Sequence, residues 1–241
     1  MFLKPFTALV ATVFTITALL ALPGCEKRFV ATGGDRFPDT PNAVKSYLAL
    51  GDSYTIGTSV TIEQRFPNQA AIQLSQQSVA FKIPDIVATS GWTTGNLLVE
   101  LAVHPPAGTY DIVTLLIGVN NQYQGRSQAE YRTHFTELLN KAIGYAGGRK
   151  ARVVVLSIPD YSVTPFAQGG DTSRIAREIN EFNNINKEIS TAAGVHYLNI
   201  TDISREARQD PSLIAGDGLH PSGKQYDRWS ARLVPIIKAA L

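Results

Sequence analysis

Short apolar runs alternate along this chain with longer stretches in which apolar residues recur every three or four positions. Runs of the first kind are typical of buried β-strands, and the longer pattern is typical of helices with one apolar face. The pattern predicts five strands, at 46–50, 83–88, 111–117, 152–158 and 195–200.

Four segments between and after these strands predict helices. Ser127 with Glu130, and Ser222 with Gln225, have the spacing of a capping box, in which two side chains bond free N–H groups at a helix start. Pro235 should kink the last helix, because proline cannot donate the usual hydrogen bond. Apolar stripes at helical spacing occupy 66–74, 131–142, 175–189 and 226–237.

Strands that alternate with helices predict the α/β class with three layers, in which helices cover both faces of a five-stranded, mostly parallel sheet. Right-handed crossovers and a flavodoxin-like strand order, 2-1-3-4-5, satisfy this connectivity. The chain has 241 residues, of which 44% are hydrophobic, and this is enough for one well-packed domain but few for two. We expect that domain to span 43–241.

The first 25 residues follow a different pattern. Lys4 precedes an apolar stretch, 6–22, that contains no acidic residue and ends in Leu22-Pro23-Gly24-Cys25. This pattern predicts an export signal at 1–24. A retained membrane anchor is the alternative, although the stretch is shorter than the roughly 20 apolar residues that a spanning helix needs.

The sequence Leu-Pro-Gly-Cys resembles the bacterial lipobox. The resemblance implies that Cys25 is lipidated and that the protein is anchored to a membrane in the extracytoplasmic cell envelope, since several acyl chains give stable binding. Plain secretion is the alternative. Residues 25–42 are rich in glycine and proline and predict a lipidated tether. Because Cys25 is the only cysteine, no disulfide can form within the chain.

Charge and histidine spacing narrow the range of partners. The formal net charge is only +2, and the densest basic cluster, Arg149, Lys150 and Arg152, precedes an apolar strand as a solvated loop would. We therefore expect no nucleic-acid partner. The histidines do not have the spacing of a metal-ligand set, so we expect no metal or cofactor, and we expect a monomer.

Three polar or small residues fall at equivalent places after the first three strands. Ser53, Gly91 and Asn120 each lie three positions beyond a predicted strand end. In the expected strand order these strands are neighbours, and ligands bind beyond the carboxyl ends of such strands. Asp217 and His220 lie in the last loop, immediately before the final helix, which could return them to the same edge.

These residues stand in four short motifs, Gly51-Asp52-Ser53-Tyr54, Ser90-Gly91-Trp92, Gly118-Val119-Asn120-Asn121 and Asp217-x-x-His220. Their order and spacing resemble the four blocks of the SGNH (GDSL-type) hydrolases, over about 47–229. The resemblance implies that Ser53 is the nucleophile, His220 the base and Asp217 its orienter. It also implies an oxyanion hole formed by the N–H groups of Ser53 and Gly91 and the side chain of Asn120.

Two residues depart from the family pattern. Tyr54 replaces the usual leucine, at a position that we expect not to touch the chemistry, and Asn121 replaces the usual aspartate, which leaves open how its loop is braced. Asp202 is the rival to Asp217 as orienter, and Asp52 is more simply explained as a brace of the turn. The elbow Gly-x-Ser-x-Gly of ordinary α/β-hydrolases is absent, because position 55 is threonine.

The predicted function is that of a cofactor-independent serine esterase that cleaves carboxylic esters through an acyl-enzyme intermediate. Short-chain acyl esters, acetylated glycans and lysolipids are all open as substrates. One alternative is an O-acetyltransferase of envelope glycans, which would exclude water in favour of a sugar hydroxyl. Another is a non-catalytic envelope binding lipoprotein, although a binder has no need of a matched nucleophile and base.

Overall fold

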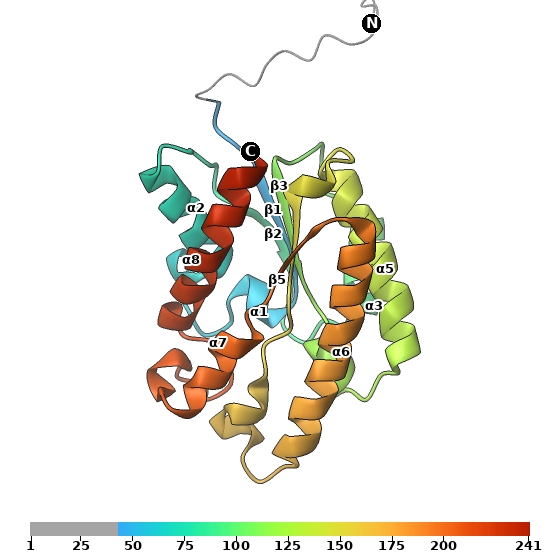
Figure 1. Ribbon diagram of the computed structural model, residues 1–241, viewed down its shortest axis with the longest axis vertical. Helices are drawn as coiled ribbons and strands as arrows, with labels where there is room; N and C mark the ends of the chain where they lie inside the picture. The colour runs from blue at the N-terminus through green and yellow to red at the C-terminus, as the bar shows by residue number, and fades with distance from the viewer. Residues whose placement is uncertain (1–42) are drawn as a thin grey trace, which may run out of the picture. The chain divides into compact units, whose positions relative to one another are not determined.

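The computed structural model describes residues 43–241, which form a five-stranded sheet with helices on both faces (Figure 1). All strand pairs are parallel and the strand order is β2-β1-β3-β4-β5, which confirms the predicted order and the α/β class. The predicted signal peptide, Cys25 and the tether lie outside the described residues. The strands are β1 Tyr47–Gly51, β2 Asp85–Ala88, β3 Ile112–Leu116, β4 Val153–Leu156 and β5 His196–Leu198.

Strands β2, β1 and β3 end level with one another. Gly51 at the end of β1 is paired with Ala88 of β2 on one side and with Leu116 of β3 on the other. The segments that follow β1, β2 and β3 therefore leave the sheet side by side, which places Ser53, Gly91 and Asn120 near one another.

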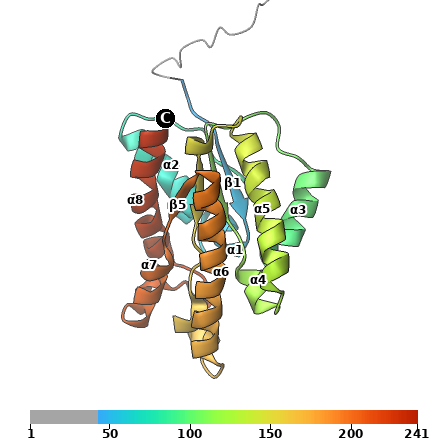
Figure 2. The same ribbon diagram turned by 45° about the vertical axis from the view of Figure 1, so that its right-hand side comes forward.

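Two layers of helices cover the sheet (Figures 1 and 2). Helices α2 and α8 pack against each other on one face, and α3, α5 and α6 pack in sequence on the other. The α-helices are α1 Ser53–Ile56, α2 Phe66–Gln76, α3 Thr94–Val103, α4 Val119–Tyr123, α5 Gln128–Tyr145, α6 Thr172–Ala193, α7 Thr201–Arg205 and α8 Gly223–Ala240. Short 3-10 helices are η1 Ile62–Gln64, η2 Lys150–Arg152, η3 Tyr161–Val163, η4 Pro165–Ala167, η5 Glu206–Arg208 and η6 Pro211–Leu213.

The predicted helix signals act at the observed helix ends. The Ser127 hydroxyl accepts a hydrogen bond from the Glu130 N–H at the start of α5, and Gly194 ends α6 in the left-handed conformation. The Ser222 hydroxyl caps α8 through the Gln225 N–H. Pro235 lies inside α8 without ending it, and the helix continues to Ala240.

All five strands are present, but most of their ends differ from the prediction by one or two residues. Strand β2 begins at Asp85 rather than at 83, because Pro84 has no N–H to donate and Ile83 is 81% exposed. Strand β5 ends at Leu198 rather than at 200, because the Ile200 N–H donates to the Ser157 hydroxyl (2.8 Å) instead of to a neighbouring strand.

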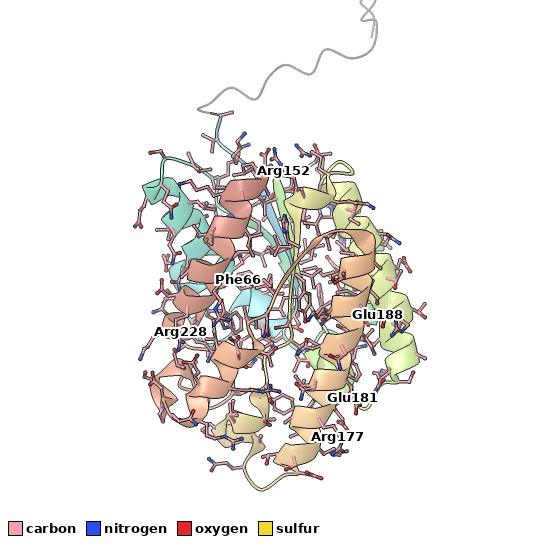
Figure 3. All side chains as sticks on the ribbon, in the orientation of Figure 1. Phe66, Arg152, Arg177, Glu181, Glu188 and Arg228 are labelled. Atoms are coloured by element: carbon pink, nitrogen blue, oxygen red, sulfur yellow. The ribbon has the colours of Figure 1, made fainter. Side chains whose placement is uncertain are left out.

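The core lies on both faces of the sheet, where the strand side chains meet the apolar stripes of the helices (Figure 3). The largest fully buried side chains are aromatic, and they include Trp229, Tyr47, Tyr131, Tyr226 and Phe66. Within the part of the chain that the structure describes, no helix has the length and apolar character needed to cross a membrane.

Candidate active site

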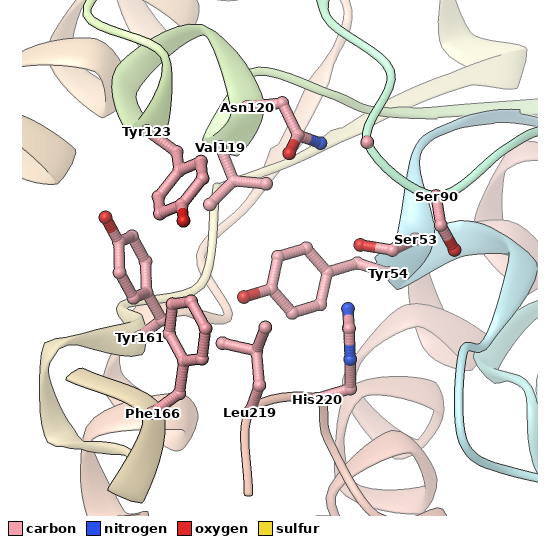
Figure 4. Close-up of a pocket in the computed structure, with 11 residues that line it drawn as sticks. Ser53, Tyr54, Ser90, Val119, Asn120, Tyr123, Tyr161, Phe166, Leu219 and His220 are labelled. Atoms are coloured by element: carbon pink, nitrogen blue, oxygen red, sulfur yellow. The ribbon is translucent and has the colours of Figure 1, made fainter. Parts of the chain in front are cut away.

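The loops beyond β1, β2 and β3 and the loop before α8 enclose a cavity of about 190 Å³ (Figure 4). Four of the predicted site residues line it together. Its lining comprises Ser53, Tyr54, Ser90, Gly91, Val119, Asn120, Tyr123, Tyr161, Phe166, Leu219 and His220. Asp217 does not line the cavity but contacts His220 from behind.

Ser53 is placed by a sharp turn from β1 into α1, of which it is the first residue. The Asp52 carboxylate caps this helix by accepting a hydrogen bond from the Tyr54 N–H (3.0 Å). A side chain at Gly51 would collide with Thr55 and with the Leu116 carbonyl, so only glycine lets the chain turn so close to the sheet. The turn leaves the Ser53 side chain on the cavity.

Asp52 is buried beside the serine but does not line the cavity. Burial raises the pKa of Asp52 to about 7, against the opposing effect of the backbone N–H groups of Tyr54 and Gly118. Its Oδ2 atom is buried and accepts no hydrogen bond of normal geometry from the described residues. Asp52 thus acts as the brace of the turn, and its charge changes near neutral pH.

His220 lies opposite Ser53 across the cavity. Its Nδ1 atom is 2.6 Å from Asp217 Oδ2, and its other ring nitrogen points toward Ser53 (Figure 4). The structure records no hydrogen bond from the Ser53 hydroxyl among residues 43–241. In unliganded enzymes such bonds are often long and tighten only when substrate binds.

Tyr54 packs edge-on against the His220 ring, with ring centroids 5.6 Å apart, and also contacts Trp229. Tyr54 therefore borders the site in contact with the candidate base, and the expectation that it takes no part in the chemistry stays a prediction. The aromatic ring that replaces the family's leucine supports the imidazole and lines the cavity.

The Asp217 carboxylate is held by four hydrogen bonds. Oδ1 accepts from the N–H groups of Leu219 and His220 (2.9 Å each), and Oδ2 accepts from the Ser59 hydroxyl and from the His220 ring (2.6 Å each). Burial raises the pKa of Asp217, but these hydrogen bonds together outweigh burial and hold the pKa well below its ordinary value. The carboxylate therefore stays ionised and favours the Nδ1–H tautomer of His220.

Ser59 was not apparent from the sequence as a site residue, because it lies 158 positions from Asp217. Its backbone has a positive φ of 69°, which is rare for a residue other than glycine. The surrounding turn holds this strained conformation, in which the hydroxyl reaches the carboxylate.

The predicted oxyanion donors flank Ser53 from β2 and β3. Gly91 has a φ of +85°, a conformation that favours glycine, and its backbone borders the cavity. The Asn120 amide donates one N–H to the Trp92 carbonyl (3.0 Å), which fixes its orientation and leaves a second N–H.

Asn121, which departs from the family pattern, braces this loop directly. Its Oδ1 accepts from the Thr94 N–H (2.9 Å) and its Nδ2 donates to the Thr94 hydroxyl (2.8 Å). These two hydrogen bonds tie the loop after β3 to the start of α3. The Asn121 amide therefore braces this loop in place of the family's aspartate.

The rival residues lie elsewhere. Asp202 on α7 forms an ion pair with Arg232 (2.7 Å) and has no recorded contact with His220. His104 ends α3, His134 lies on α5 and His196 on β5, and none of them lines the cavity. Among residues 43–241, no group of three acidic, histidine or cysteine side chains is arranged to hold a metal.

Three aromatic residues that the sequence did not bring together form one side of the cavity, and we call them the aromatic wall. Tyr123, Tyr161 and Phe166 contact one another with ring centroids 6.0–6.3 Å apart. Tyr123 lies on α4, whereas Tyr161 and Phe166 come from the segment after β4 and carry no sequence signal. The Trp92 side chain does not line the cavity.

A parallel sheet covered by helices, with a serine and a histidine facing one another beyond the carboxyl ends of its strands, is typical of serine hydrolases. Residues 49–228 match the sequence model of the GDSL-like Lipase/Acylhydrolase family. The chain belongs to this family, and it is a carboxylic ester hydrolase. This membership makes it an enzyme rather than a non-catalytic binding lipoprotein.

Solved structures show the same fold. The protein TesA covers 82% of this chain and is covered over 100% of its own length, with a TM-score of 0.61 and 18% identity. The acetylxylan esterase Axe2 from Geobacillus stearothermophilus has a TM-score of 0.63 and 16% identity over 82% of this chain and 96% of its own. The psychrotrophic esterase EstA from Pseudoalteromonas sp. has a TM-score of 0.58 and 20% identity over 81% of this chain and 97% of its own. No curated protein sequence matches the chain.

Proposed function

We propose that the protein is a serine esterase that cleaves carboxylic esters of short acyl groups through an acyl-enzyme intermediate. The observation that carries this proposal is the convergence of Ser53, Gly91, Asn120 and His220 on one cavity, with Asp217 bound to His220. These residues supply a nucleophile, a base, an orienting carboxylate and oxyanion donors.

In the proposed first half-reaction, Ser53 Oγ attacks the ester carbonyl while His220 takes its proton. The oxyanion of the tetrahedral intermediate accepts hydrogen bonds from the N–H groups of Ser53 and Gly91 and from Asn120 Nδ2. The C–O bond to the alcohol then breaks, and His220 returns the proton to the leaving alkoxide. The Asp217 carboxylate stabilises the imidazolium while it carries the proton.

The second half-reaction repeats these steps with water. His220 removes a proton from water, the hydroxide attacks the acyl carbon, and the carboxylic acid leaves as Ser53 regains its proton. No cofactor is required, because proton transfer and hydrogen bonding supply all of the chemistry.

The size of the cavity supports short acyl groups. A protein cavity of about 150 Å³ holds a benzene molecule. The cavity at Ser53, about 190 Å³, would accommodate acyl groups from acetyl to about six carbons, but not the whole chain of a long lysolipid. The structural neighbour Axe2 is described as an acetylxylan esterase, which supports acetylated glycans among the candidates.

Solvent access favours hydrolysis over acetyl transfer to a sugar. Tyr123 and Phe166, at the edge of the cavity, are 60% and 50% exposed. Water therefore reaches the edge of the cavity, which supports hydrolysis, because a transferase needs to exclude water.

The proposal is tested by stopped-flow hydrolysis of 4-nitrophenyl esters with two to twelve acyl carbons. We expect a burst of 4-nitrophenol close to one equivalent of enzyme, followed by slower turnover, because an acyl-enzyme forms before it is hydrolysed. We expect kcat/KM to decline beyond about six acyl carbons, from the cavity volume. Hydrolysis without an acyl-enzyme, detected by mass spectrometry of the quenched reaction, would refute the mechanism.

Asp217→Asn is expected to lower kcat by about 10⁴ with little change in KM, because the amide loses the charge and favours the wrong histidine tautomer. Steady-state kinetics with 4-nitrophenyl acetate measures the effect. Asp202→Asn is the matched control and should stay within a few-fold of the parent enzyme. If Asp217→Asn keeps most of its kcat, Ser53 and His220 work as a dyad and the carboxylate is structural.

We propose that the protein is lipid-anchored in the cell envelope through Cys25. The proposal is supported by the sequence Leu22-Pro23-Gly24-Cys25, which follows an apolar stretch and resembles the bacterial lipobox. The described domain begins at residue 43, so residues 25–42 would serve as the tether between the anchor and the domain.

Cys25→Ser is expected to abolish labelling by a clickable palmitate analogue and to release the protein from membranes, while ester hydrolysis is kept. Fractionation and fluorescence imaging of gels check both parts. Full membrane retention of the unlabelled variant would instead indicate an uncleaved apolar helix.

A further inference from the structure

A second cavity, of about 620 Å³, adjoins the first one at the aromatic wall. Tyr123, Tyr161 and Phe166 border both cavities. The rest of the second cavity is formed by residues from two segments, 122–128 and 167–182, and none of these residues belongs to the catalytic set. Its size falls in the range of about 300–1,000 Å³ that is usual for small-molecule sites.

The second cavity has a mixed polar lining. Arg126 and Arg174 face it together with three acidic residues, Asp171, Glu178 and Glu181. The Arg126 side chain is exposed and has no recorded hydrogen bond or ion pair among residues 43–241. Arg174 is only loosely paired, with Nη1 3.9 Å from Glu178 Oε1. Both guanidinium groups can therefore donate to a ligand.

A chain of hydrogen bonds joins this polar lining to the aromatic wall. The Tyr161 hydroxyl donates to Gln122 Oε1 (2.9 Å), and Gln122 Nε2 donates to Glu178 Oε2 (2.7 Å). The wall and the polar residues thus have fixed positions relative to one another before any ligand binds, which lowers the entropy cost of recognition.

The composition of the lining selects among ligand classes. An anionic ligand would meet three carboxylates, and an apolar chain would remove water from charged groups without replacing their hydrogen bonds. Hydroxyl groups both donate and accept, so a neutral polyhydroxylated ligand satisfies arginines and carboxylates alike. The exposed rings of Tyr123 and Phe166 offer apolar faces to the C–H surfaces of a sugar ring.

We propose that the second cavity is a saccharide-binding subsite, which holds the sugar part of an acylated glycan while the ester group reaches Ser53 across the aromatic wall. The inference rests on the proposed esterase function only for the placement of the ester. The binding of sugar itself is independent of catalysis.

Binding is measured first, by titration calorimetry of the Ser53→Ala protein with xylotetraose, cellotetraose and chitotetraose. We expect at least one of these neutral oligosaccharides to bind, and Arg126→Ala in the same background to raise its Kd roughly tenfold, as expected for loss of a hydrogen bond to a charged group. Arg174→Ala should act in the same direction. Arg177→Ala is the matched control, since Arg177 is an exposed arginine on the same helix but does not line the cavity (Figure 3).

Kinetics of the enzyme with Ser53 intact then tests the link to catalysis. Arg126→Ala should raise KM roughly tenfold for the acetylated form of the bound oligosaccharide and leave 4-nitrophenyl acetate hydrolysis unchanged. Absence of binding by all three oligosaccharides, or equal Kd values for Arg126→Ala and Arg177→Ala, would overturn the subsite. If Arg126→Ala instead raises KM for long-chain acyl esters but leaves the Kd of the oligosaccharides unchanged, the cavity is a lipid site and the subsite proposal is overturned. If sugars bind through Arg126 but no ester is cleaved, the esterase proposal fails and the saccharide site stands.

Discussion

Replacing Ser53 with alanine is expected to lower kcat for 4-nitrophenyl acetate by about 10⁶, the size of loss found when a serine hydrolase loses its nucleophile. The physical reason is that Ser53 is the serine placed between His220 and the candidate oxyanion donors, and water cannot replace it as a covalent nucleophile. The fold should be kept, because the side chain lies on the cavity and takes no part in the recorded hydrogen bonds of residues 43–241.

The matched control for this variant is Ser90→Ala. Ser90 also lines the cavity, but its hydroxyl bonds to Thr58 (2.6 Å) and it has no base beside it. A fluorophosphonate probe should label Ser53 alone, as peptide mapping by mass spectrometry can show. Labelling of Ser90, or an active Ser53→Ala enzyme, would show that the nucleophile is another residue.

His220→Ala is expected to lower kcat by a similar factor of about 10⁶, since nucleophile and base act as a unit. His104→Ala, His134→Ala and His196→Ala are the controls, because these histidines lie away from the cavity. Each should retain esterase turnover within a few-fold. A comparable loss in any of the three would identify a different base.

His220 and two nearby carboxyls, Asp217 and Asp52, are the candidates for the group that sets the pH dependence of the parent enzyme at low pH. We expect kcat/KM to fall as the pH is lowered, because a protonated imidazole cannot accept the serine proton. Asp217 does not cause this fall, since its lowered pKa keeps it ionised. Asp52, whose burial raises its pKa to about 7, would gain a proton as the pH falls below neutrality.

Asp52→Asn distinguishes the two possible origins of the acid limb. The amide removes the titration of the carboxyl beside Ser53 and can still cap α1 through its side-chain oxygen. We expect the acid limb of kcat/KM to persist in this variant, as required if it reports His220. Disappearance of the limb would assign it to Asp52.

Local sequence patterns predicted most of the fold. Five apolar runs became five strands in the predicted order, because buried parallel strands and amphipathic helices have patterns that act over a few residues. The ends of β2 and β5 were less predictable. The start of β2 depends on Pro84. The end of β5 depends on the hydrogen bond that the Ser157 hydroxyl accepts from the Ile200 N–H, which forms only when distant segments meet.

The residues of the candidate site that stand in short motifs were also visible in the sequence. Ser53, Gly91 and Asn120 follow strand ends, and Asp217 and His220 are three positions apart, so their grouping needs only the strand order. Their roles stay predictions, which the variants above test.

The sequence by itself determined the class of the fold, the family and the residues that carry the proposed chemistry, since each depends on local spacing. Only the tertiary structure decided what surrounds them. Ser59 reaches Asp217 from 158 positions away, and Tyr161 and Phe166 join Tyr123 in a wall between two cavities. The physical reason is that a hydrogen bond or a ring contact depends on distance in space, and folding sets that distance through the packing of the whole sheet and its helices.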